Sequence, residues 1–188
     1  MKLLPLVRCS VFLLLALPVL LGLSFKLEES TITYTAQDSR DTWQGAAPLE
    51  DVTLAETAEG LRVKAVLEPG RFDSGNFARD GNAHLTVFDT GEFPTATLTG
   101  ALPLPAPLTG LEASGTTTET FSGTLTLHGV TQEVSFPVEV SRDGTQAAAT
   151  GSFAVLLSDY EMTRPNLFGN QVKDRVELSV SLTGTFVP

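Results

Sequence analysis

The side chains that most often carry catalysis or hold metal ions are few in this chain. His84 and His128 are its only histidines, and neither has the spacing of a metal-binding pair or a neighbouring nucleophile motif. The chain has no Gly-x-Ser-x-Gly or Ser-x-x-Lys motif and no glycine-rich phosphate loop. We therefore expect no catalytic residues, no metal site and no enzymatic activity.

Two arginines could meet the phosphate or carboxylate headgroup of a ligand through paired N–H donors. Arg79 lies in an irregular segment directly before Asp80, and Arg164 lies in a loop directly before Pro165. For Arg79 we favour a local brace, because the neighbouring Asp80 carboxylate would already neutralise the guanidinium. Arg164 is then the better headgroup candidate, although Glu161 could pair with it.

The N-terminal segment has the layout of a signal peptide. Lys2 and Arg8 supply a positive start, Val11–Leu21 is apolar, and the small residues Gly22 and Ser24 fit a cut after Ser24. The apolar run is short for a membrane span, which takes about 20 residues. We expect export to the periplasm or the cell exterior after cleavage, with an uncleaved anchor as the alternative.

The expected domain organisation is a signal peptide at residues 1–24 followed by one β domain at residues 25–188. The only cysteine, Cys9, lies in the leader, so the exported domain would have no disulfide partner and no thiolate metal ligand. The formal net charge of the whole chain is −10 at pH 7, without a basic stripe. This charge argues against nucleic acid as a partner.

The most regular part of the sequence is Phe121–Val140, in which apolar and polar residues alternate with a period of two. Such a period is typical of strands with one apolar face and one wet face. The break at His128-Gly129 predicts an antiparallel hairpin. We expect further strands at residues 25–36, 52–57, 61–67, 95–102, 144–157 and 172–187. Between them we expect an irregular excursion with one helical turn at 69–93, a proline-stiffened connection at 102–111 and a loop at 158–169.

Strands of this kind, about eight in number, predict an all-β fold that closes into an antiparallel barrel with one or two short helical turns. Alternation alone does not say which face is inside. With one Trp and two Tyr, the chain is poor in the aromatic girdles of an outer-membrane barrel, so we place the apolar face inside and keep that barrel as the lesser alternative. A barrel of this size is filled by its own side chains or encloses one slim ligand.

Four patches along the chain then carry a family resemblance through their order and spacing. They are Phe25–Tyr34 with Gly45; Phe72–Asp80 with His84-Leu85 and Glu92-Phe93-Pro94; Gly123–Thr131 with Val134–Val138; and Arg164–Gly169 with Val172, Asp174 and Val176. With these patches the chain resembles the YceI-like family of bacterial periplasmic lipid-binding proteins. The resemblance implies an elongated lipocalin-like barrel, whose apolar pore holds a polyisoprenoid or a quinone-like lipid, and no catalytic residues.

Large apolar residues in the irregular segments, together with Phe153, are our candidates for the pore or its entrance. They are Phe72, Phe77, Phe88, Phe93, Phe153, Tyr160, Leu167 and Phe168. The predicted function is non-catalytic binding of a long-chain isoprenoid or related lipid by an envelope carrier, store or scavenger. The alternative is a filled barrel that binds another protein; whether the chain forms a homodimer stays open.

Overall fold

The computed structural model describes residues 24–57, 59–103, 114–167 and 169–187. The predicted leader with Cys9, apart from Ser24, and most of the predicted proline-stiffened connection lie outside the described residues. Nine antiparallel strands form one sheet in the order β2-β1-β11-β8-β7-β6-β5-β4-β3. Their bounds are β1 (Ser24–Gln37), β2 (Thr42–Pro48), β3 (Asp51–Thr57), β4 (Gly60–Leu67), β5 (Ala96–Leu102), β6 (Ser114–Leu127), β7 (Val130–Asp143), β8 (Gln146–Leu156) and β11 (Arg175–Val187).

The predicted central hairpin is confirmed and is longer than its sequence pattern suggested. β6 and β7 pair from Ser114↔Asp143 to Leu127↔Val130. The two residues between the strands, His128 and Gly129, have φ values of 51° and 75°. Positive φ at both central positions defines the tight turn whose twist matches that of the flanking strands. The strands expected at 52–57 and 61–67 are confirmed as β3 and β4, which pair antiparallel from Asp51↔Val66 to Thr57↔Gly60.

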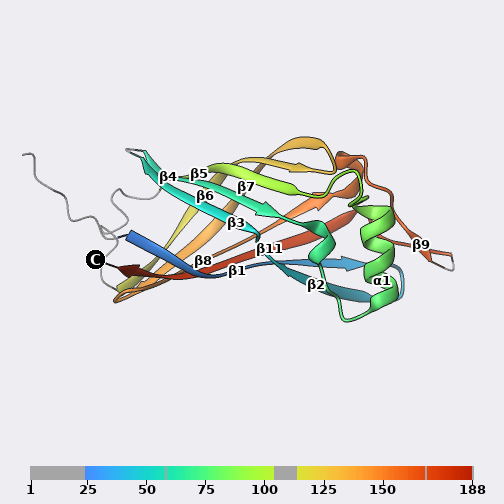
Figure 1. Ribbon diagram of the computed structural model, residues 1–188, viewed down its shortest axis with the longest axis horizontal. Coiled ribbons are helices and arrows are strands. Elements are labelled where there is room, and N and C mark those ends of the chain that lie inside the picture. The colour runs from blue at the N-terminus through green and yellow to red at the C-terminus, as the bar shows by residue number, and fades with distance from the viewer. Residues whose placement is uncertain (1–23, 58, 104–113, 168, 188) are drawn as a thin grey trace, which may run out of the picture.

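The chain that contains β2 and β3 joins the two edges of the sheet. β2 pairs with β1, whereas β3, which follows it directly, pairs with β4 at the other end of the strand order. At the link, the N–H of Leu49 donates to the carbonyl of Ser30, and the N–H of Glu50 donates to the carbonyl of Val66. The sheet therefore curls into a half-barrel (Figure 1), which confirms the predicted all-β, lipocalin-like antiparallel barrel. β2 was not expected from the sequence pattern.

Helical segments gather at one end of this half-barrel, and the start of β1 and the end of β11 lie at the other end (Figure 1). The excursion contains more helix than the short turns predicted for it, because a 3₁₀ turn is followed by an α-helix that runs directly into a π-helical turn. The segments at this end are η1 (Pro69–Arg71), α1 (Phe77–Asn82), η2 (Ala83–Val87), η4 (Leu157–Tyr160) and the small hairpin of β9 (Asn166–Leu167) and β10 (Asn170–Gln171). None of the helices in the described part of the chain is long and apolar enough to cross a bilayer.

The apolar faces of the strands point into the half-barrel. Every buried side chain among the described residues is apolar or aromatic, apart from the hydroxyls of Tyr34 and Tyr160. The buried residues form two clusters, one around Ile32, Leu127 and Leu178 and the other around Leu61, Phe121 and Phe136. The interior is thus apolar along its length.

Candidate functional site

The interior contains three apolar cavities in a row. The helix-side cavity, between Tyr34 and Leu157, has a volume of about 110 Å³. The middle cavity, beside Phe153, has about 40 Å³, and the far cavity, between Leu54 and Phe186, has about 100 Å³. One water-sized group needs roughly 10–15 Å³ of such volume, so each cavity has room for several. Close-packed protein interiors contain few voids of this size.

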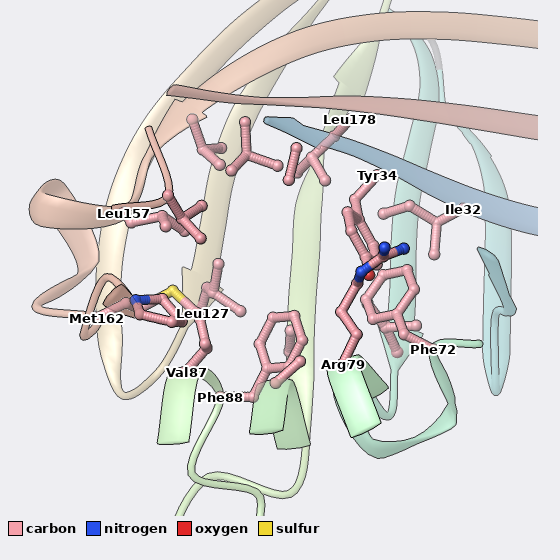
Figure 2. A pocket seen from close by; sticks show the side chains of 18 of the residues that line it. Ile32, Tyr34, Phe72, Arg79, Val87, Phe88, Leu127, Leu157, Met162 and Leu178 are labelled. Carbon is pink, nitrogen blue, oxygen red and sulfur yellow. The ribbon is translucent and has the colours of Figure 1, made fainter. Parts of the chain in front are cut away.

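The helix-side and middle cavities form nearly one compartment. Five residues line both of them: Ile32, Leu67, Ala96, Leu125 and Leu178. In Figure 2, Val87 and Phe88 rise from the helical segment toward Leu178 on the opposite wall. Leu157 and Met162 close one flank, and Tyr34 and Phe72 close the other. The walls are almost entirely apolar, which suits the tail of a lipid.

A short polar rim interrupts these apolar walls at one flank. Tyr34, Trp43, Arg79 and Asn82 all line the helix-side cavity. The guanidinium carbon of Arg79 lies 4.8 Å from the centroid of the Trp43 ring, within the range of a cation–π contact. Figure 2 shows the Arg79 side chain reaching from α1 to the ring of Tyr34. The rim thus places a cation and an aromatic hydroxyl beside an apolar cavity.

The Tyr34 hydroxyl stays protonated at neutral pH. Burial and the Asp80 carboxylate raise its pKa, and hydrogen bonds with Ser74 and Trp43 and the charge of Arg79 only partly oppose this rise. A protonated phenol offers an O–H donor as well as an acceptor. The rim can therefore interact with a polar ligand group by charge and by hydrogen bonding.

The sequence holds Arg79 in place through the start of α1. Asn76 is the N-cap, and its side-chain oxygen accepts a hydrogen bond from the Arg79 N–H at 3.1 Å. Asp80 accepts hydrogen bonds from the N–H and the hydroxyl of Ser74, the latter at 2.6 Å. The predicted brace between Arg79 and Asp80 is therefore wrong. Asp80 links the preceding loop to the helix through Ser74, and Arg79 contacts Trp43 instead.

Comparison with known protein families matches residues 23–184 to the YceI-like domain. The chain belongs to the YceI-like family. Among curated protein sequences, no relative matches it. The family resemblance predicted from the four sequence patches is confirmed by this match, which spans them all.

Solved structures share the fold of this YceI-like domain at low sequence identity. A polyisoprenoid binding domain from Saccharophagus degradans superposes with a TM-score of 0.71 at 18% identity, covering 88% of this chain and all of that one. BcnA from Burkholderia cenocepacia gives 0.68 at 20% identity, with 83% and 96% covered. The YCEI protein of Campylobacter jejuni gives 0.54 at 12% identity, with both chains fully covered. These likenesses establish the fold of the chain.

Three of the predicted pore residues lie at the cavities of this YceI-like domain. Phe72 is buried and Phe88 half-buried at the helix-side cavity, with their rings stacked 5.7 Å apart. Phe72 also meets the Tyr34 ring edge-on at 5.0 Å. Phe153 lines the middle cavity. Three of the residues predicted from the sequence thus line the helix-side or the middle cavity.

Three other candidates line none of the three cavities, which corrects the expectation that they face the pore. Phe77 is 94% exposed on α1. Phe93 packs on the ring of His128 at 4.3 Å, and Tyr160 is buried in the core beside them. The side chain of Leu167 and all of Phe168 lie outside the described residues.

Arg164 also lies outside the cavity walls. Its Nε is 4.0 Å from the Asp174 carboxylate, and its Nη2 is 3.5 Å from the Gln171 side-chain oxygen. Ser158 donates to Asp174 through both its N–H and its hydroxyl, and these hydrogen bonds hold the pKa of that carboxyl below its ordinary value. Arg164 thus interacts with Asp174 and Gln171 at the surface and does not belong to the rim.

Both histidines make structural links. A ring nitrogen of His84 donates to the carbonyl of Phe72 at 3.1 Å, and one of His128 donates to the carbonyl of Tyr160 at the same distance. Over residues 24–57, 59–103, 114–167 and 169–187, no group of three acidic, histidine or cysteine side chains is arranged to hold a metal ion.

Several cavity residues escaped the sequence analysis. Trp43 lies on β2, which carries no clear alternation, and Met162 lies in a segment assigned only as a loop. Tyr34 shares its face of β1 with Ile32 and Ala36, so the period of two could have marked it. Asn76, a favoured N-cap residue, could have marked the start of α1 and with it the position of Arg79.

Proposed function

We propose that this YceI-like domain binds the apolar tail of an isoprenoid or related lipid in its interior, with the polar end of the lipid at the rim. The observation that carries this proposal is the placement of the polar rim, with Arg79, Trp43 and Tyr34, beside a cavity whose walls outside the rim are apolar. A long tail with one polar end matches that arrangement. The Saccharophagus domain with the same fold is described as polyisoprenoid binding, which supports this tail class.

Burial of the tail supplies the affinity. Each enclosed methylene contributes about 0.8 kcal/mol. The described walls contain no buried charged group that the tail would separate from water. The tail enters and leaves without a chemical step, so we propose a non-catalytic carrier, store or scavenger of lipid.

For the polar end we propose Arg79 in place of Arg164. Among the described residues, the ion pairs involve Arg71, Arg164 and Arg175, and no carboxylate comes within 4.0 Å of Arg79. An arginine without a carboxylate partner keeps its donors for a phosphate or carboxylate of the ligand. We further propose that the protein acts in the cell envelope, after removal of its leader near Ser24.

Native mass spectrometry tests this function. The full chain, expressed with its own leader in a bacterium, is purified from the envelope without detergent, and bound material is extracted into organic solvent. We expect one stoichiometric adduct that fragments as an isoprenoid or a quinone. A bare protein mass that stays unchanged with excess geranylgeraniol would refute lipid binding and favour a filled barrel that binds another protein.

A further inference from the structure

A row of phenylalanine rings lies at the border between the middle and far cavities. Phe153 lines the middle cavity and Phe136 lines the far cavity. Their rings stack with centroids 4.3 Å apart and planes 13° apart. Phe121 continues the row, 5.0 Å from Phe136. These residues come from β6, β7 and β8, so the row crosses three adjacent strands.

The backbone beneath this row is shaped to receive it. A Cβ atom on Gly151 would come within 2.9 Å of the Phe136 ring, closer than side chains normally approach. Glycine at this position therefore lets Phe136 lie flat against β8. Phe136 is 5% exposed and Phe121 is 3% exposed, so packing fixes both rings. Phe153 is half-buried and faces the compartment on the helix side.

Aliphatic side chains form the rest of the border between the two cavities. Leu98 and Val180 line both the middle and the far cavity. A tail that enters at the polar rim would pass the helix-side and middle cavities and meet Phe153, which lines the middle cavity, before Phe136, which lines the far cavity. Stacked rings held by packing resist displacement more than a single mobile side chain does.

We propose that the Phe136–Phe153 stack is a chain-length stop. It fixes how much of a lipid tail the compartment formed by the helix-side and middle cavities accepts. This inference rests on the proposed lipid binding and adds the residues that select the ligand by length. Tails that end before the stack are fully enclosed. Longer tails gain no further burial, because the stack keeps them out of the far cavity.

The test measures the affinities of the purified full chain for farnesol, geranylgeraniol and solanesol, which share a headgroup and differ in length. For the unchanged chain we expect the affinity to rise with tail length at first and then to level off before the longest alcohol. In Phe153→Ala we expect solanesol to gain at least about tenfold over geranylgeraniol, since enclosing two more methylene groups suffices for that gain. Phe153→Leu, which keeps an apolar side chain but cannot stack, should shift the preference the same way if the alanine variant fails to fold.

Leu182→Ala is the matched control, because Leu182 lines the far cavity but does not belong to the stack. It should leave the length preference unchanged. If the unchanged chain already gains affinity up to solanesol, and both Phe153 variants show the same profile, the stop is refuted while lipid binding stands. If no alcohol of the series binds any variant, lipid binding itself fails, and the stop fails with it.

Discussion

The guanidinium carbon of Arg79 lies 4.8 Å from the centroid of the Trp43 ring, at the rim of the helix-side cavity. The two residues come from different parts of the fold, α1 and β2, and meet only when β2 joins the edge of the sheet. Their contact explains why a cation remains at an apolar cavity without a carboxylate: the face of the Trp43 ring stabilises it.

Arg79→Gln should weaken binding of geranylgeranyl phosphate more than binding of geranylgeraniol. Loss of a hydrogen bond to a charged group costs about 1.5 kcal/mol or more, which is about tenfold in affinity. Isothermal titration with both ligands measures this difference. Arg164→Gln is the control and should change neither affinity; an equal loss in both arginine variants would contradict the assignment of the rim.

Phe88→Ala should weaken tail binding and lower the free energy of unfolding by about 2 kcal/mol, less than for a fully buried ring because Phe88 is half-buried. Phe77→Ala, in the same helical segment, removes an equal side chain that is 94% exposed. It should change the unfolding free energy by less than about 0.5 kcal/mol. Urea unfolding and lipid titration of the two variants measure the unfolding free energy and the affinity. Equal losses in Phe88→Ala and Phe77→Ala would contradict the described orientation of this helical segment.

Gly45→Ala should destabilise the rim through Tyr34. Gly45 and Tyr34 are cross-strand partners in β2 and β1, and a Cβ on Gly45 would fall 2.7 Å from Cζ of the tyrosine ring. Such overpacking typically costs about 1–3 kcal/mol. Thermal unfolding measures it against Gly115→Ala, a strand glycine with no atom within 4 Å of the added Cβ. Similar stabilities for the two variants would refute the close approach of Tyr34.

The two hydrogen bonds from Ser158 to Asp174 should contribute to the free energy of unfolding in a pH-dependent way. Hydrogen bonds from Ser158 lower the pKa of Asp174 in the folded state. The contribution is therefore complete above the unfolded pKa of about 3.9 and is lost as the pH falls through the lower folded value. We expect Asp174→Asn to be less stable than the unchanged chain at pH 7, with the gap closing below about pH 4. Urea unfolding from pH 7 to pH 3 tests this, and a gap that widens in acid would contradict the sign.

Most of the strands were predictable because one physical signal, the period of two, marks them. Phe121–Val140 shows it most clearly, and the structure extends that hairpin from Ser114 to Asp143. The same signal predicts two faces but does not say which face is inside. β2 was missed because Gly45 and Ala46 interrupt its pattern, and its position depends on pairing with a distant strand end.

The site was only partly predictable, because several of its contacts join residues that are distant in the sequence. Phe72 and Phe88 were found because large apolar residues in a polar segment need cover. Phe77 has the same type and context, yet helical geometry turns it to solvent. The partner of Arg79 was misassigned because Asp80 is its neighbour in sequence, whereas Trp43 is its neighbour only in space.

The emission of Trp43 offers the most direct test of lipid binding at the rim. Trp43 is the only tryptophan of the chain and lines the helix-side cavity, so its fluorescence reports on that cavity alone. On titration with geranylgeraniol we expect a blue shift that saturates at one equivalent in the unchanged chain and in Phe77→Ala, but at higher concentration in Phe88→Ala. Emission that does not change with the lipid, or that changes identically in all three proteins without saturating, would contradict a tail bound beside Tyr34, Trp43 and Arg79.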